Sequence, residues 1–129
     1  MVSKKAQGII EFIVIFGAIF FFFVIFLSII QYNIREKNIE KEQVLAMNLA
    51  LSVQDEISLA NGASDGYYRE FTLPQTILGK DYTIGIVDGR VFISGEKIGM
   101  SYQVISVTGN VQKGINVIKK ENGEVLLNQ

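Results

Sequence analysis

The stretch KKAQGIIEFIVIFGAIFFFFVIF, residues 4–26, decides the architecture of this chain. From Phe12 to Ile30 the sequence runs for 19 residues without a charged side chain. A helix of that length spans ~28 Å at ~1.5 Å per residue, close to the ~30 Å hydrocarbon thickness of a bilayer. The run therefore predicts a membrane-spanning helix, with a carboxylate, Glu11, at its head.

A secretory signal peptide is the first alternative for this apolar run. Its apolar region would be only about 7–15 residues long and would lead into a small-residue cleavage site. Here the polar boundary is SIIQYNIREKNIEKE, residues 28–42, and Ile30, Gln31 and Tyr32 suit such a site poorly. We therefore expect the span to be retained.

Composition separates the two ends of the chain. Seven of the nine phenylalanines fall in the first 26 residues, whereas ten of the twelve glycines lie from Gly62 onward. This division indicates one membrane segment followed by one small domain. The net charge of −1, with both signs scattered, lacks the basic patch that a nucleic-acid partner requires, so no nucleic acid is expected.

The chain has no cysteine and no histidine. Disulfide frameworks, thiolate zinc sites, thiol nucleophiles and imidazole bases are therefore excluded. Carboxylate pairs such as Asp55 with Glu56, or Asp81 with Asp88, are more simply solvated surface than an acid and base pair or a calcium site. Phosphate loops, nucleophile elbows and metalloprotease helix motifs are also missing from the sequence. We expect a non-enzyme without cofactor or metal.

The helix is predicted to continue beyond the apolar run. No proline or glycine interrupts residues 31–60, and Leu45, Leu49, Val53 and Ile57 recur every four residues. The pattern predicts one helix from about Ile9 to Asn61, with an amphipathic outer half. Asn61 and Gly62 suit a left-handed helix stop, followed by a turn-rich link through Gly66.

From Tyr67 the hydrophobic period changes from helical to alternating. Asp88-Gly89 and Asn122-Gly123 each join two β-branched runs, which is a strong signal for a β-hairpin. Five or six short antiparallel strands are expected, in a small sheet or partial barrel, at residues 67–73, 82–87, 90–94, 101–107, 115–120 and 124–128. Because so small a domain scarcely builds its own core, the helix's outer half should cover one face of the sheet. The predicted fold class is α+β.

The segment KKAQGIIEF, residues 4–12, resembles the class III signal peptide of archaeal type IV pilin-like proteins. Residues 46–86 look like the helix-to-sheet region of small euryarchaeal members. The resemblance implies a basic leader, residues 1–6 with Lys4 and Lys5, which a prepilin-type signal peptidase removes between Ala6 and Gln7. Residues 7–61 would then be the long helix and residues 62–129 the β domain.

The resemblance also implies a role for Glu11, the fifth residue after the predicted cut. In the family, this glutamate is thought to lie near the freed N-terminal amine of a neighbouring subunit, here the amine of Gln7. A carboxylate in an apolar helix bundle is tolerable when it is paired with an ammonium group. The alternative is that Glu11 is a charge at the membrane interface, where the free-energy cost of a carboxylate is small.

Two sets of side chains are expected to pack the helix. The phenylalanines of the apolar run, among them Phe12, Phe16, Phe20 and Phe23, are predicted to face lipid or neighbouring helices rather than to form a conductive stack. Leu49, Val53 and Ile57 should face the sheet or neighbouring helices.

Two classes of function remain open on the sequence alone. In the first, the chain is a structural subunit of an archaeal type IV pilus-like adhesion filament, a helical homopolymer built through N-terminal helices and stored in the membrane beforehand. In the second, it is a single-pass anchored accessory protein, such as a minor pilin or an archaellum stator-like component. Lysine and arginine counts on the two sides of the span do not decide orientation. The resemblance implies a cytoplasmic N-terminus and an extracellular β domain.

Overall fold

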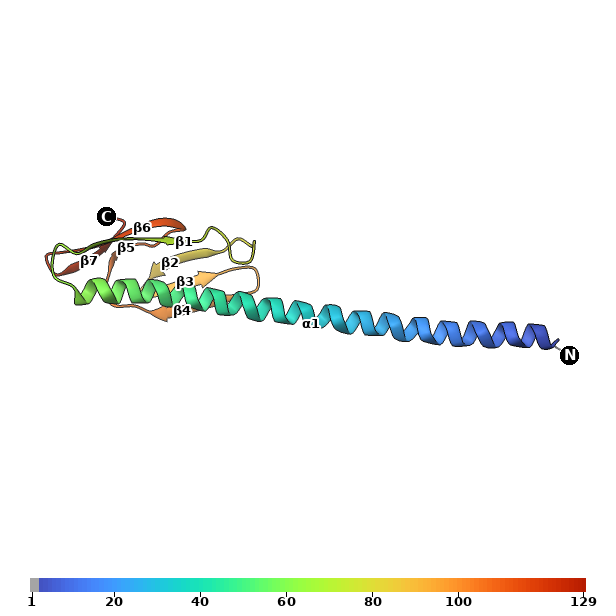
Figure 1. The fold of residues 1–129 in the computed structure, drawn as a ribbon. Coiled ribbons are helices and arrows are strands. Elements are labelled where there is room, and N and C mark those ends of the chain that lie inside the picture. Colours follow the sequence, from blue (N-terminus) through green and yellow to red (C-terminus); the bar gives the residue numbers. More distant parts are fainter. Residues whose placement is uncertain (1–2) are drawn as a thin grey trace. The chain divides into compact units, whose positions relative to one another are not determined.

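The computed structural model describes residues 3–129, in which one helix precedes seven strands (Figure 1). These elements are α1 (Lys4–Gly62), β1 (Tyr68–Leu73), β2 (Thr83–Val87), β3 (Arg90–Ser94), β4 (Gly99–Gln103), β5 (Thr108–Gly109), β6 (Gly114–Glu121) and β7 (Glu124–Leu127). The chain divides into two compact units, one reaching to Asn38 and one running from Ile39 to Gln129. The C-terminal part of α1 thus belongs to the same unit as the strands.

The predicted α+β fold, a long helix with a small β domain packed on its outer half, is confirmed. The strands form two sheets, with orders β1-β6-β7-β5 and β2-β3-β4. Every pairing is antiparallel except that of β5 with β7, where Thr108 lies opposite Leu126 in a parallel ladder. The expectation of antiparallel strands alone is therefore wrong at this one pair.

Both predicted hairpin turns are confirmed. Asp88 and Gly89 have φ angles of 50° and 69°, and Asn122 and Gly123 have 52° and 77°. Positive φ at both central residues is the type I′ geometry, whose twist matches that of the flanking strands. The turns set the registers of β2 with β3, through Val87 opposite Arg90, and of β6 with β7.

The predicted strand over residues 101–107 is partly wrong. The ladder of β4 ends at Gln103, and the chain then crosses to the other sheet, where β5 begins at Thr108. The β-branched residues Val104, Ile105 and Val107 continue through the crossing, which is why the sequence pattern reads as one strand. Residues 104–107 therefore form a connection between the two sheets.

The ends of α1 also differ from the prediction. The helix starts at Lys4, before the expected Ile9, and Gly62 does not have the expected left-handed conformation. Instead, the Lys120 ammonium group donates hydrogen bonds to the carbonyl oxygens of Asn61 at 2.5 Å and Ala63 at 2.9 Å. A cation on the terminal carbonyls satisfies acceptors that a helix leaves unpaired and complements its dipole.

The core of the second unit lies between α1 and the strands. Along the helix, one stripe is fully buried at Ala46, Ala50, Val53, Ile57 and Ala60. The small alanines let the strands approach the helix closely, while Val53 and Ile57 fill the space between. The strands supply many of the other buried apolar residues, among them Leu73, Ile84, Val91, Ile93, Ile118, Val125 and Leu127, and the loops supply the rest. Each fully buried aliphatic side chain contributes about 1.5–3 kcal/mol.

Candidate functional site

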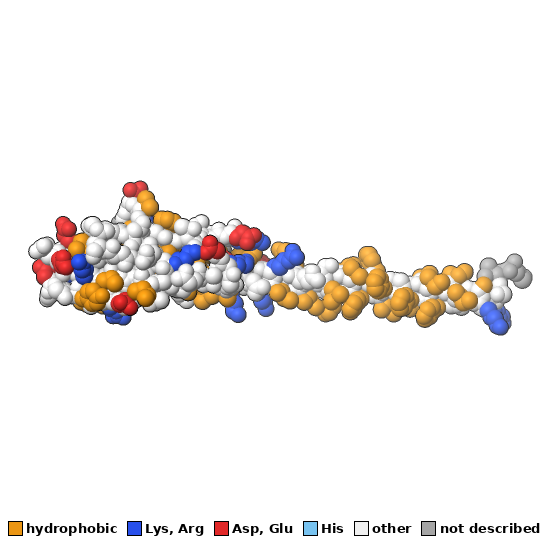
Figure 2. Space-filling view, turned by 90° about the horizontal axis from the view of Figure 1, so that it is seen from above, with side chains coloured by type: hydrophobic (Ala, Val, Ile, Leu, Met, Phe, Trp, Pro, Cys, Tyr) orange, Lys and Arg blue, Asp and Glu red, His pale blue; other side chains and the backbone are white. Residues whose placement is uncertain are grey.

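The N-terminal half of α1 presents an apolar surface that the chain itself does not cover. Its most hydrophobic 18-residue window has a mean hydropathy of 3.1 and none of it is buried. Hydrophobic side chains dominate this segment in Figure 2. Phe12, Phe16, Phe20 and Phe23 expose 67%, 59%, 59% and 54% of their surface. By length and composition, this part of α1 is a candidate membrane-spanning helix.

Two aromatic contacts occur along this apolar surface. The rings of Phe12 and Phe16, one turn apart, stack with their centroids 6.1 Å apart, and those of Phe21 and Phe22 meet edge-on at 6.1 Å. Offset and edge-on ring pairs of this kind are favourable beyond the area they bury. They leave most of each ring free to contact lipid or another helix.

The residues predicted for leader processing lie in the first turns of the helix. Ser3 caps the helix: its hydroxyl oxygen accepts from the backbone N–H of Ala6 at 3.3 Å, and its carbonyl oxygen accepts from that of Gln7 at 3.0 Å. Lys4 and Lys5 are exposed. The peptide bond between Ala6 and Gln7 is thus at a helix end, where helical hydrogen bonds fray most readily.

Glu11 has a contact within its own chain that the sequence interpretation missed. The side-chain amide of Gln7 donates to the Oε1 atom of Glu11 at 3.3 Å. The four-residue spacing of a glutamine and a glutamate on one helix is the signal that would have predicted it. A neutral amide offers Glu11 a hydrogen bond but does not neutralise its charge, so a cationic partner would still stabilise the carboxylate in an apolar environment.

The outer packing residues belong to a different surface from the N-terminal set. Val53 and Ile57 are fully buried, and Leu49 is half-buried against the same core. These three side chains therefore contact the chain's own strands in the second unit. Among the predicted packing residues, the four phenylalanines are the ones whose surface remains available to a partner or to lipid.

An ion pair between a buried carboxylate and a half-exposed lysine was not foreseen from the sequence. Glu42 is only 1% exposed, and its Oε2 atom lies 3.2 Å from the Nζ atom of Lys80. Glu42 precedes Ala46 and Ala50 by one and two turns, so it continues the buried stripe of α1. That spacing was the available signal, and the pair links the helix to the loop between β1 and β2.

We expect Lys80→Met to destabilise the second unit by about 3 kcal/mol, because it leaves the Glu42 carboxylate buried without its partner. Lys80 is itself 43% exposed, so water screens the pair and places the effect at the lower end of the range for broken buried pairs. Thermal unfolding of the full chain in detergent measures it. Lys97→Met is the matched control, since Lys97 is exposed and forms no ion pair among residues 3–129. Equal melting temperatures for the two variants would contradict the prediction.

A second charged cluster holds the same loop. Lys113 forms an ion pair and hydrogen bond with Asp81, which lowers the pKa of that carboxyl group. The Lys113 ammonium group also lies 4.9 Å from the centre of the Tyr82 ring. Burial raises the pKa of the Tyr82 hydroxyl group, which donates to the carbonyl oxygen of Pro74 at 2.5 Å. The ion pair joins this loop to the residue that precedes β6, and the Tyr82 hydrogen bond closes the loop on itself.

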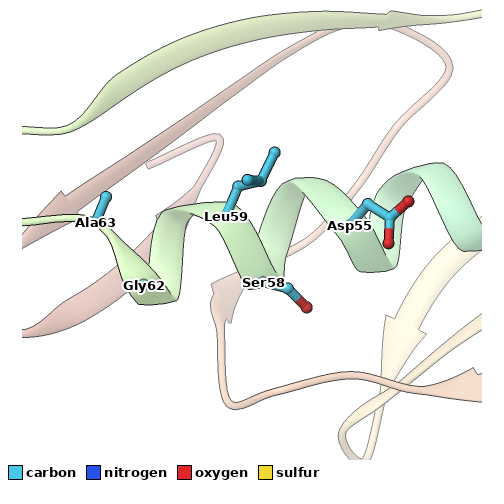
Figure 3. A pocket seen from close by; sticks show the side chains of 5 residues that line it. All are labelled: Asp55, Ser58, Leu59, Gly62 and Ala63. Atoms are coloured by element: carbon cyan, nitrogen blue, oxygen red, sulfur yellow. The ribbon is translucent and has the colours of Figure 1, made fainter.

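Asp55 and Glu56, the other carboxylate pair considered from the sequence, lie in different surroundings. The Oε2 atom of Glu56 lies 3.2 Å from the Nε atom of Arg69, close enough for an ion pair but without hydrogen-bond geometry. Asp55 instead lines a shallow depression with Ser58 and Leu59 near the end of α1 (Figure 3). Within residues 3–129, no three or more acidic, histidine or cysteine side chains are grouped so as to hold a metal ion.

In comparisons with family models, curated proteins and solved structures, nothing matches this chain. The candidate site therefore rests on its own geometry. It consists of the uncovered apolar half of α1, with the linked side chains of Gln7 and Glu11 near its start.

Proposed function

We propose that the chain is a structural subunit of an archaeal type IV pilus-like surface filament that serves in adhesion. The observation that carries the proposal is the apolar half of α1, of which the most hydrophobic window is wholly uncovered. Removing apolar surface from water is favourable by a free energy of about 25 cal/mol for each Å². Such a helix needs either lipid or the helices of other subunits around it, and a filament subunit uses the two in succession.

Glu11 is the residue that distinguishes this function from simple anchoring. A membrane anchor gains nothing from a carboxylate at the head of its span, whereas a filament subunit can pair it with the N-terminal amine of a neighbour. Under this proposal the amine is that of Gln7, freed when a prepilin-type signal peptidase cuts after Ala6. The precursor has its N-terminus in the cytoplasm, and the assembled subunit is extracellular. The chain is proposed to have no catalytic activity.

The first test concerns the mature N-terminus. We expect subunits in sheared surface filaments to begin at Gln7 with a free amine, because the proposed peptidase cut lies directly before it. A cyclised Gln7 would support the cut but would contradict the pairing, since cyclisation removes the amine that Glu11 needs. Mass spectrometry of the N-terminal peptide identifies the start, and microscopy of the same fraction identifies the filaments. Cells that lack the peptidase are the control and should keep residues 1–6 on the chain.

Two results would contradict the proposal. One is recovery of the chain with residues 1–6 attached in cells that have the peptidase. The other is its absence from sheared filaments when the membrane fraction contains it.

The second candidate is a single-pass anchored accessory protein, such as a minor pilin or an archaellum stator-like component. The contact of Gln7 with Glu11 favours it, since the chain itself supplies Glu11 with a hydrogen-bond donor. A subunit that stays in the membrane would then need no neighbour to hold this side chain. It would be found in the membrane fraction and not in filaments.

A further inference from the structure

The turn between β6 and β7 is docked on the loop that follows α1. Its central residues are Asn122 and Gly123, and Glu121 lies opposite Glu124 at its base. On the loop side, the backbone N–H of Gly66 donates to the carbonyl oxygen of Lys120 at 2.8 Å. The two segments are far apart in sequence, so this turn is part of the tertiary structure as well as a hairpin connection.

An asparagine followed by glycine is chemically labile. The backbone nitrogen of the glycine, once it has lost its proton, attacks the side-chain carbonyl carbon Cγ of the asparagine. A new C–N bond closes a five-membered succinimide ring, and ammonia leaves. Water then opens the ring at one of its two carbonyl groups, giving aspartate or isoaspartate. Glycine favours the reaction because no side chain hinders the approach.

Asn122-Gly123 has the sequence and exposure for this reaction, but its nucleophilic nitrogen is occupied. The backbone N–H of Gly123 donates to the Oδ1 atom of Asp65 at 2.8 Å. Hydrogen bonds to an ionised acceptor are roughly twice as strong as neutral ones. The bond also fixes the orientation of the peptide group, and the nearby negative charge opposes loss of the amide proton. We propose that Asn122 is a latent deamidation site that Asp65 protects.

Deamidation of Asn122 would weaken the contact of the turn with Asp65, the same contact that slows the reaction. The product carries a new carboxylate at position 122, next in sequence to Gly123, whose N–H contacts Asp65, and between the paired residues Glu121 and Glu124. Like charges so close together repel each other. A first deamidation event would therefore weaken the contact between the turn and the loop.

The test compares Asp65→Ala with Asp55→Ala in the full chain in detergent micelles. Asp55 is an exposed carboxylate on α1, so its variant removes the same charge without removing a hydrogen bond to Gly123. Both proteins and the unaltered chain are incubated at mildly alkaline pH, and deamidation is followed at each asparagine by peptide mass spectrometry. We expect Asp65→Ala to raise the rate at Asn122 roughly tenfold, equivalent to ~1.4 kcal/mol of protection, and Asp55→Ala to leave it unchanged.

Asn61-Gly62, at the end of α1, is an internal reference in the same samples. A rise confined to Asn122 supports the proposal, whereas an equal rise at Asn61 overturns it, because protection would then belong to the fold as a whole. The unaltered chain gives an independent test when native and urea-unfolded samples are compared. Equal rates at Asn122 in the two samples would also overturn the proposal.

Discussion

Gly109→Ala is expected to destabilise the β domain by about 4 kcal/mol or more, a size reached by few single substitutions. Gly109 has a φ of +106°, a conformation that residues with a side chain rarely adopt. A Cβ atom placed there would lie 1.9 Å from the carbonyl oxygen of Leu127. That oxygen belongs to the backbone of Leu127, a fully buried residue of β7, so the strand itself would have to move.

The substitution would disrupt the one parallel strand pairing in the two sheets. Gly109 lies opposite Leu127 in the ladder of β5 with β7, and Leu127 also lies opposite Ile118 in β6. A shift of β7 away from β5 would therefore disturb its other neighbour as well. Chemical unfolding of the full chain in detergent, followed by a probe of tertiary structure, measures the effect.

Gly99→Ala is the matched control for this substitution. Gly99 also lies in a strand, but a Cβ atom there meets nothing within 4 Å and its φ is not in the left-handed range. We expect its free energy of unfolding to stay within about 0.5 kcal/mol of the unaltered chain. If Gly109→Ala behaved like Gly99→Ala, the close approach of β5 to β7 would be wrong.

The features that the sequence predicted well are those that short-range patterns determine. The i, i+4 spacing of Val53 and Ile57 depends only on the period of a helix. Asp88-Gly89 and Asn122-Gly123 specify their turns because few other residue pairs adopt positive φ twice in succession. Helix, hairpins and the α+β class all follow from such local rules.

The features that it missed depend on residues brought together from a distance. Nothing near Thr108 shows that β5 pairs in parallel with the last strand, because the partner begins 16 residues later at Glu124. The spacing of Glu42 from Ala46 and Ala50 indicates its burial, but nothing in the sequence indicates that its partner is Lys80, 38 residues later. The left-handed stop predicted at Gly62 is replaced by Lys120, which caps the helix although it lies 59 residues after Asn61 in the sequence.

The candidate site was predictable in its hydrophobic part and less so in its polar part. Phe12 to Ile30 is apolar on every side, and its exposure follows because the chain has no second apolar helix among residues 3–129 to cover it. The contact between Gln7 and Glu11 depends on side-chain conformation within one helical turn. Because of this contact, a substitution at Glu11 can alter both a hydrogen bond inside the chain and a charge that a neighbouring subunit would pair with.

Glu11→Gln is expected to leave the chain inserted in the membrane and processed at Gln7, yet largely absent from filaments. A glutamine still presents an Oε1 atom to the Gln7 amide, so the contact inside the chain can persist. What the substitution removes is the negative charge. If that charge pairs with the amine of a neighbouring Gln7, its loss leaves an ammonium group unpartnered in an apolar bundle, at about 3–5 kcal/mol per subunit. The ratio of sheared to membrane-retained subunit, read by immunoblot with mature size on the same gel, measures the effect.

Glu36→Gln is the matched control, because Glu36 is an exposed glutamate of the same helix outside the apolar run and has no ion pair among residues 3–129. It should retain the unaltered ratio. A Glu11→Gln chain that also retained this ratio would show that the carboxylate is only a tolerated charge at the membrane interface. Pairing of Glu11 with a neighbouring amine would then no longer explain filament assembly. The uncovered phenylalanines would fit a permanent membrane anchor equally well, since lipid covers their rings as completely as neighbouring helices do.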